Sequence, residues 1–210
     1  MFVAFEGLDG SGGTTQIGLF AGAVRARGRG CVVTREPSDG PVGALIRAQL
    51  AVPAGGWVAG ASDTGNAVRV GDAVFGHLFA ADRRDHLDRI VLPAVSRGEV
   101  VLTDRYFLSS LAYQSLALGL DRVWRLNEEF VAADAVVMLD LAPEECLRRV
   151  EARGGVRDRF ETLDQLRKIG DAYEAAISRC VARGDRIVRI DARGAPEEVH
   201  ARVWSAVWPT

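Results

Sequence analysis

The sequence predicts an α/β fold, in which helices cover both faces of a five-stranded, doubly wound parallel sheet. Five short runs are rich in Val, Ile, Leu and Phe, segments with helical periodicity lie between them, and a glycine-rich loop follows the first run. Continuous apolar runs are typical of strands buried on both faces of a parallel sheet. Strands that alternate with helices imply right-handed crossovers.

The predicted strands are short and apolar, as strands at the centre of a compact sheet are. In chain order they are Phe2–Phe5, Cys31–Thr34, Val100–Thr103, Ala135–Leu141 and Arg186–Ile190. The spacing between them leaves room for at least one helix in each connection, which parallel pairing requires.

Two segments between the strands show clear helical spacing. After the first strand, Ile17, Phe20 and Val24 recur at intervals of three and four residues, which predicts a helix with one buried face. The same spacing runs through 87–95, and Pro93 should kink that helix because proline lacks an N–H and crowds the preceding turn.

Pro143 is expected to open a helix over Pro143–Arg153, because the first position of a helix needs no N–H donor. Ala51–Asn66 is rich in Gly and Ala and shows no helical or strand periodicity. A loop of that length is unusual, so this segment is expected to belong to an interface or to move, unless it contains a short helix.

The composition argues against several classes of protein, among them nucleic-acid-binding, disulfide-rich and membrane proteins. The chain has 210 residues with 48% hydrophobic and 26% charged content, which is ordinary for a folded domain, and we expect one domain over 1–210. A net charge of −2 gives no basic field for nucleic acid. The three cysteines are too dispersed for a metal cluster or disulfide framework, and no membrane span or signal segment is visible. These observations favour a cytoplasmic protein without nucleic-acid or membrane partners.

The segment Gly7–Thr15, which reads GLDGSGGTT, follows a strand and opens a helix. In that context such a loop is a phosphate-binding loop, because its backbone N–H groups and the helix end attract phosphate oxygens. The residues expected to bind the nucleotide are Gly7, Gly10, Ser11, Gly12, Gly13, Thr14 and Thr15. The Thr14 hydroxyl occupies the position that holds Mg²⁺. A merely tight turn with spare glycines is the alternative.

Gly13 stands where the P-loop pattern has lysine. Phosphoryl transfer depends mainly on positioning and charge stabilisation, and losing one stabilising group typically costs roughly 10²–10³ in rate. A replacement cation must come from an arginine or from Lys168, which is the only lysine in the chain.

The loop and four later motifs resemble the thymidylate kinase family, in the family's order and across nearly the whole chain. Phe5–Gly12 is similar to its P-loop. The later matches are Thr34–Pro37, Leu78–Arg83 with His86, Thr103–Tyr106 followed by Ser109–Gln114, and Arg153 with 157–161. The resemblance implies a P-loop NTPase-type sheet, a small arginine-bearing lid at about 153–161, ATP as phosphate donor and Mg²⁺ as metal.

The resemblance also implies a site for the acceptor nucleotide. It places Phe79 against the acceptor base, Arg83 at the base edge and Tyr113 against the deoxyribose. An aromatic face suits a flat pyrimidine, and the fork of arginine suits planar acceptors. The other residues implied for this site are Asp9, Glu36, Arg105, Ser110 and Gln114. Phe79 could instead be a core residue and Arg83 a solvated helix residue.

Asp104 and Arg105 follow a predicted strand, at the carboxyl edge where open α/β sheets bind ligands. The resemblance gives both a catalytic role. Asp104 would hold Mg²⁺ together with Thr14, as hard oxygen ligands do, and Arg105 would hold the acceptor phosphate. A simple ion pair at the strand end is the alternative for Asp104.

The segment that resembles the lid contains both arginines and glycines. Gly154 and Gly155 permit movement, and Arg153 and Arg159 would meet the transferring phosphates on closure and act in catalysis. Leu8–Gly12 contains no arginine, which fits the family members whose arginines lie in the lid. A solvated basic turn is the other possibility.

Besides Gly13, the chain departs from the family between Ser38 and Gly76. Ser38–Pro41 stands where the family often has Gly-Gly-Thr, and Ala51–Asn66 matches no motif. In the family this region borders the acceptor pocket and contributes to a homodimer interface. The resemblance therefore implies a homodimer but leaves the acceptor's identity open.

The sequence favours an enzyme that acts on small-molecule nucleotides: a nucleoside monophosphate kinase that transfers the γ-phosphate of ATP to dTMP or a close analogue, and slowly because the P-loop lysine is absent. One alternative is a kinase for a modified nucleotide in a specialised pathway. Another is a nucleotide-binding homologue without catalysis. Gly13 favours the last, whereas Arg105 and the lid arginines favour a kinase.

Overall fold

The predicted fold is confirmed: the protein is an α/β structure built on one parallel sheet. The computed structural model describes residues 1–51, 70–153 and 162–208. Its strands are β1 (Phe2–Gly7), β2 (Cys31–Arg35), β3 (Val100–Asp104), β4 (Ala135–Asp140) and β5 (Ile187–Asp191). They pair in parallel in the order β2-β3-β1-β4-β5.

At their carboxyl ends, β1, β2, β3 and β5 extend beyond the apolar runs that predict them. Arg35 pairs with Asp104 and Asp140 pairs with Asp191 in the ladder, so backbone pairing continues past the last buried side chain. β4 is shorter than predicted and ends one residue before Leu141, and β5 begins one residue after Arg186. Hydropathy locates the buried part of a strand and misses its polar end.

Ten α-helices occupy the described part of the chain. They are α1 (Gly13–Ala26), α2 (Pro41–Leu50), α3 (Asp72–His86), α4 (Leu92–Ser96), α5 (Phe107–Tyr113), α6 (Ser115–Leu118), α7 (Leu120–Arg125), α8 (Pro143–Arg153), α9 (Leu163–Arg183) and α10 (Pro196–Val207). Pro143 opens α8 as predicted. The segment at 52–66, which gives no pattern in sequence, lies outside the described residues, and so does most of the predicted lid.

Pro93 lies in the first turn of α4, and a π-helical turn, η1 (Leu87–Val91), joins it to α3. A π turn is a recognised cause of irregularity in a helix. The predicted disturbance at Pro93 therefore takes the form of a wider turn before the proline. This turn still buries Leu87 and Val91 against the sheet.

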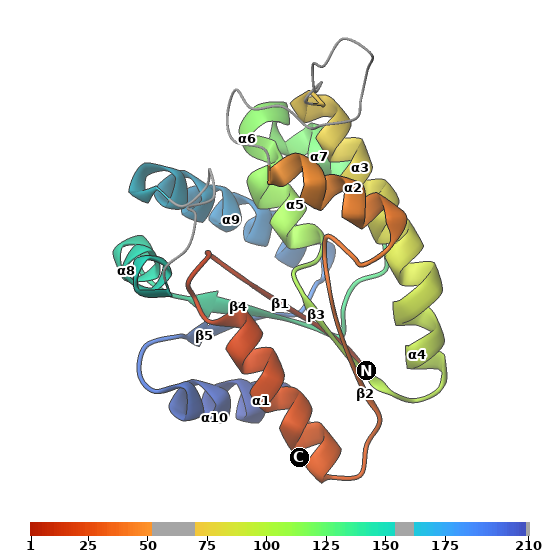
Figure 1. Cartoon of the computed structure of the whole chain (residues 1–210), viewed down its shortest axis with the longest axis vertical. Helices are drawn as coiled ribbons and strands as arrows, with labels where there is room; N and C mark the ends of the chain where they lie inside the picture. Colours follow the sequence, from red (N-terminus) through yellow and green to blue (C-terminus); the bar gives the residue numbers. More distant parts are fainter. Residues whose placement is uncertain (52–69, 154–161, 209–210) are drawn as a thin grey trace.

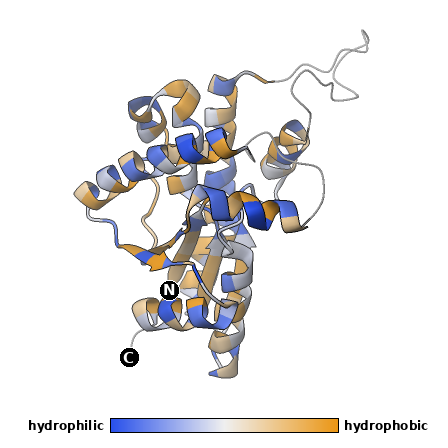
Figure 2. Ribbon diagram, turned by 90° about the vertical axis from the view of Figure 1, so that its left-hand side faces the viewer, coloured by the Kyte–Doolittle hydropathy of each residue, from blue (hydrophilic) through white to orange (hydrophobic). Residues whose placement is uncertain are grey.

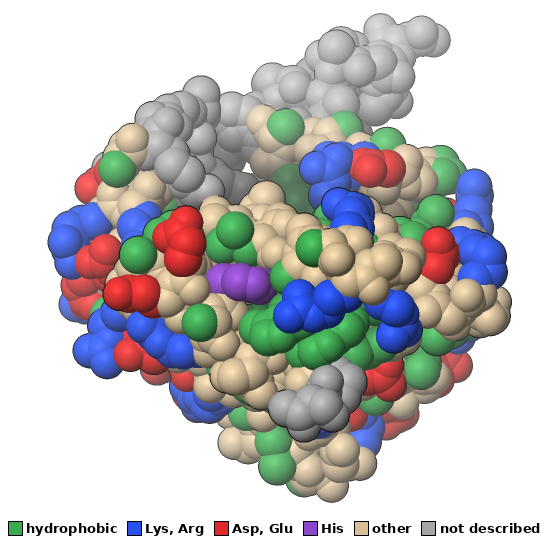
Figure 3. Space-filling view, turned by 90° about the horizontal axis from the view of Figure 1, so that it is seen from below, with side chains coloured by type: hydrophobic (Ala, Val, Ile, Leu, Met, Phe, Trp, Pro, Cys, Tyr) green, Lys and Arg blue, Asp and Glu red, His purple; other side chains and the backbone are tan. Residues whose placement is uncertain are grey.

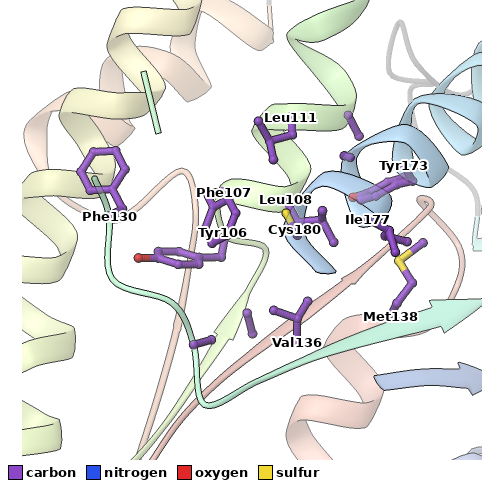
Figure 4. Close-up of a cluster of buried hydrophobic side chains, with 14 of the residues drawn as sticks. Tyr106, Phe107, Leu108, Leu111, Phe130, Val136, Met138, Tyr173, Ile177 and Cys180 are labelled. Carbon is purple, nitrogen blue, oxygen red and sulfur yellow. The ribbon is translucent and has the colours of Figure 1, made fainter. Parts of the chain in front are cut away.

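Alternate residues of each strand face opposite sides of the sheet and build two cores. Phe2, Ala4 and Val136 face the side that α5 and α9 cover. There, Leu108 and Leu111 of α5 lie near Tyr173 and Ile177 of α9 (Figure 4). The strands are largely hydrophobic, whereas the surrounding helices carry both hydrophilic and hydrophobic residues (Figure 2). This pattern explains why helices cover both faces.

On the opposite side, α1 and α10 cover Val3, Phe5 and Leu102 (Figure 1). Seen from below, this face shows a group of hydrophobic side chains beside basic ones (Figure 3). Trp204 of α10 and Trp208, which follows the helix, stack with ring centroids 4.6 Å apart, and both rings lie against Phe20 of α1 at 4.9 and 6.1 Å. The contacts with Phe20 add to the burial that holds α10 against α1.

The three cysteines, Cys31, Cys146 and Cys180, are all free thiols. Burial raises the pKa of Cys146 and of Cys180 to about 12, so both stay protonated near neutral pH. Within the described ranges, no helix is both long and apolar enough to cross a bilayer.

The strand order locates the ligand-binding edge. The chain leaves β1 toward β2 on one side, and β4 and β5 fill the other side. The carboxyl end of β1 is therefore the point where the order reverses, and in open α/β sheets ligands bind at such a point.

Candidate functional site

The glycine-rich loop joins β1 to α1 at that edge and has a shape that only glycine permits at several positions. Gly7, Gly10 and Gly12 have φ of 150°, 92° and 104°. A Cβ on Gly10 would come within 2.4 Å of the Cys146 carbonyl oxygen. These glycines are thus required by backbone conformation and by close packing.

The loop forms one wall of a cavity of about 270 Å³. Its lining includes every residue predicted to bind the donor nucleotide, together with Arg35, Glu36, Asp104 and Arg105. The N-terminal turn of α1 opens into this space, and its N–H groups and dipole favour a phosphate group.

Gly13 differs from the other loop glycines, because neither backbone nor packing requires it. Its φ lies outside the left-handed region. A Cβ there would meet a single described atom, Asp104 Oδ1, at an ordinary 3.5 Å. The loop can therefore accept a side chain at this position without rearrangement.

Thr14 and Asp104, the predicted metal ligands, lie side by side. The Thr14 hydroxyl donates to Asp104 Oδ2 over 2.8 Å. Both groups are hard oxygen donors of the kind Mg²⁺ prefers. No group of three or more His, Cys, Asp or Glu side chains in the described ranges could hold a metal alone. The pair fits Mg²⁺ that receives further oxygens from a bound phosphate.

A second cavity, of about 180 Å³, adjoins the first. All eight residues predicted for the acceptor nucleotide line it: Asp9, Glu36, Phe79, Arg83, Arg105, Ser110, Tyr113 and Gln114. The two cavities share Asp9, Glu36 and Arg105. They therefore form one continuous cleft, and Phe79 lies in its wall, half-buried, rather than in a closed core.

Arg83 forms the base of this second cavity within a fully buried network. Its Nε and NH2 groups donate to Glu36 Oε2 at 3.0 and 2.7 Å, and NH2 also donates to Ser110 Oγ. NH1 donates to Asn127 Oδ1, and Glu36 Oε1 lies 3.1 Å from His86 Nδ1. Arg83 is thus no solvated residue, and most of its N–H groups are engaged within the protein.

Arg105 lies where the two cavities meet. Its side chain donates to Asp9 Oδ1 at 2.6 Å, to Ser109 Oγ at 2.9 Å and to Tyr173 Oη at 3.0 Å. Its backbone has φ of 70°, the one positive value of a described residue other than glycine. A left-handed arginine costs about 1–3 kcal/mol and persists where surrounding contacts enforce it, often at functional sites.

Glu6 and Tyr173 lie buried beside Arg105, and the sequence patterns predict neither of them as part of the site. Glu6 accepts hydrogen bonds from the backbone N–H groups of Tyr106 and Ser109 and from the Tyr173 hydroxyl, at 2.8, 3.2 and 3.0 Å. Burial raises the pKa of Glu6, and the charge of Arg105 opposes that rise. A charged residue at the end of an apolar strand run is the signal that could have revealed Glu6.

A third cavity, of about 370 Å³, also borders the P-loop, and no sequence motif predicts it. Its lining combines loop residues with Gln16 of α1, Arg149 of α8, and Gly194 and Pro196 near the start of α10. Arg149 NH2 is fixed by the Ala192 carbonyl oxygen at 3.2 Å. Most of the residues that line this cavity are small, so the sequence offers little signal that a cavity forms there.

The predicted lid lies largely outside the described residues. Arg153 ends α8, which directs the chain toward this segment, and Arg157 and Arg159 belong to 154–161, outside the described ranges. Lys168 is exposed on α9 and does not line the cavities beside the P-loop.

Comparison with known proteins gives a consistent result. The sequence profile described as "Thymidylate kinase" matches residues 5–203. Proteins named "Thymidylate kinase" from Synechococcus sp. strains JA-2-3B'a(2-13) and JA-3-3Ab are 35% and 36% identical over 214 residues, covering 100% of this chain and 95% and 96% of theirs. A "Probable thymidylate kinase" from Thermococcus kodakarensis is 41% identical over 178 residues, or 82% of each chain.

Proposed function

We infer, because the chain belongs to the thymidylate kinase family, that it catalyses a specific reaction. In that reaction the γ-phosphate of ATP is transferred to dTMP or a close analogue. The family makes the chain a nucleoside monophosphate kinase. The observation that carries the finer proposal is the continuous cleft, which joins a phosphate-binding loop to a pocket with an aromatic wall through Arg105.

Each part of the cleft has a chemical task in this proposal. The P-loop N–H groups bind the donor phosphates, and the cavity beside Arg149 takes the donor base. Thr14 and Asp104 hold Mg²⁺, which neutralises charge on the phosphates when bound. Arg105 holds the acceptor phosphate in line with the donor, and Asp9 orients Arg105 through their 2.6 Å ion pair.

The acceptor base stacks on Phe79 and meets the polar groups of Arg83, Ser110 and Gln114, which line one cavity. Tyr113 stands beside Arg105, whose guanidinium carbon lies 5.0 Å from the centre of the Tyr113 ring, and we assign it to the sugar. Arg153 and Arg159 of the lid remain proposed to contact the transferring phosphates. We further propose a cytoplasmic homodimer.

A pyrimidine monophosphate is expected to bind better than a purine one, because stacking on one aromatic wall and a few directed hydrogen bonds leave the wrong base unpaired. Calorimetric titration of thymidylate, uridylate, adenylate and guanylate measures this, and ADP formation with the same panel and Mg²⁺ tests the reaction. Purine binding that equals or exceeds pyrimidine binding would contradict the acceptor assignment.

Gly13 supports a second candidate, a nucleotide-binding homologue without catalysis. Replacement of Gly13 by Lys decides between the two. The position accepts a side chain next to Asp104, so the Gly13→Lys variant should gain about tenfold or more in turnover, from one restored charge clamp. A Gly18→Lys variant is the control, because Gly18 lies on the same helix and a Cβ added there would meet no described atom within 4 Å. A Gly13→Lys protein that binds nucleotide but forms no ADP would favour the non-catalytic candidate.

A further inference from the structure

The missing P-loop lysine leaves no cation of the loop itself beside Asp104. Its carboxylate accepts one hydrogen bond from Thr14 and makes no ion pair with any residue that the structure describes. The empty position at Gly13 faces Asp104 Oδ1. The negative charges of Asp104 and of a bound nucleotide would therefore meet here with no loop cation between them.

Arg35 is the residue that the sheet places next to this point. It ends β2, which lies beside β3 (Figure 1), and its Cα pairs in register with that of Asp104 in β3. Residues paired across parallel strands lie about 4.8 Å apart and direct their side chains to the same face of the sheet. That face is the α1 side, because Asp104 reaches Thr14 on α1 and the preceding Thr34 contacts His86 on the opposite side.

The lining of the P-loop cavity agrees with this register. Arg35 and Arg105 are its two cationic side chains among the described residues. Arg105 is largely enclosed, with 23% of its side chain exposed, and it is engaged by Asp9, Ser109 and Tyr173. Arg35 has 57% of its side chain exposed.

Arg35 is also held weakly. Its one ion pair with a described residue is to Asp39, four positions along the chain, at 2.6 Å. Asp39 is itself 76% exposed and lies 3.6 Å from Arg47. Exposed pairs of this kind contribute little to stability, and Asp39 keeps Arg47 as a cationic neighbour when Arg35 leaves. The arginine is therefore available to a more strongly charged partner.

We propose that Arg35 supplies the positive charge that glycine at position 13 removes from the P-loop, by leaving Asp39 to contact the β- and γ-phosphates of the donor nucleotide, which a P-loop lysine reaches. The inference rests on the proposed function for its effect on rate, but its effect on nucleotide binding does not require catalysis. Arginine suits this task because its fork can bind two phosphate oxygens at once.

The test compares Arg35→Gln and Arg35→Lys with Arg89→Gln. Arg89 is the matched control, because it is 60% exposed and pairs at 2.7 Å with Asp85 four positions away, on a helix outside the cleft lining. Arg35→Gln should lower kcat roughly tenfold to a hundredfold, as loss of one stabilising donor does. Arg35→Lys should retain most of the activity, and Arg89→Gln should match the wild type.

The Gly13→Lys background supplies the deciding comparison. If lysine and Arg35 serve the same phosphates, adding Arg35→Gln to Gly13→Lys should cost less than about threefold, because the two charges substitute for one another. An equal loss in both backgrounds, or a loss no larger than that of Arg89→Gln, overturns the inference.

Equilibrium binding separates this inference from the proposed function. Calorimetry of the full chain with Mg²⁺-ATP and Mg²⁺-ADP should show that Arg35→Gln weakens ATP binding more than ADP binding. A wild-type protein that phosphorylates no monophosphate refutes the kinase proposal, and the ATP-to-ADP comparison still decides on Arg35. Equal weakening of both nucleotides, or of neither, rejects it.

Discussion

Replacing Arg83 with Ala should lower the free energy of unfolding by about 3–5 kcal/mol, the typical cost of removing one partner of a buried ion pair. Arg83 and Glu36 have 1% and 2% of their side chains exposed and lie 2.7 Å apart. The substitution leaves the Glu36 carboxylate buried beside His86 and deprives Asn127 and Ser110 of their donor. For a domain of ordinary stability this is a large fraction of the total.

The adjacent Arg84 provides a matched control, because it is 49% exposed and its pair with Asp88 spans 3.5 Å. Arg84→Ala should change stability by no more than about 0.5 kcal/mol. Urea unfolding monitored by circular dichroism measures both variants. Equal midpoints for the two would show that the Arg83 network does not stabilise the fold. A Glu36→Gln, Arg83→Met double variant should recover part of the loss, because it removes both charges together.

The sheet and its binding edge could be predicted from sequence because hydropathy and glycine placement are local signals. The five apolar runs give the strands, and a strand followed by Gly7–Thr15 gives the P-loop. The resemblance then supplies the residues of the second cavity, and the structure gathers all of them in one lining. Their roles as ligands stay predictions.

What the sequence could not reveal depends on pairs of residues that are distant in the chain. Glu6 and Tyr173 meet across 167 positions, and Asp104 and Arg35 meet through sheet register. Asn127 is a buried amide in a segment without a motif, and its partner Arg83 lies 44 positions earlier. Such pairings follow from strand order and crossover geometry, which a single sequence does not specify.

Arg105 contacts several of these distant groups at once. We therefore expect its loss to lower activity more than the loss of any other residue. It contacts Asp9 on the P-loop and Tyr173 on α9. Its positive charge also lowers the pKa of Glu6, against the rise that burial causes. Its left-handed backbone is held by an N–H bond to the Phe5 carbonyl oxygen at 2.9 Å and by the Thr103 hydroxyl on its own carbonyl, also at 2.9 Å. Fixed donors of this kind need no reorganisation during reaction.

Arg105→Ala should reduce kcat by about 10³-fold, near the upper end for one preorganised donor. The substitution also removes the positive charge that favours the ionised form of buried Glu6. Arg105→Lys, which keeps that charge, is therefore measured alongside it. Lysine keeps the charge but loses the fork, so an intermediate loss is expected. Arg97→Ala is the control, since Arg97 is 60% exposed and pairs with Glu99 on the surface. Thermal unfolding of each variant reports any loss of folded protein.

A binding comparison distinguishes contact with the acceptor phosphate from a purely structural role. Arg105→Lys should weaken thymidylate binding while leaving thymidine binding nearly unchanged, because only the former carries the phosphate that the guanidinium would hold. Calorimetry with both ligands provides the two affinities. Equal weakening of thymidine and thymidylate would mean that Arg105 shapes the pocket through Asp9 and Tyr173 without touching the phosphate, and the assignment of the acceptor phosphate to the junction of the two cavities would fail.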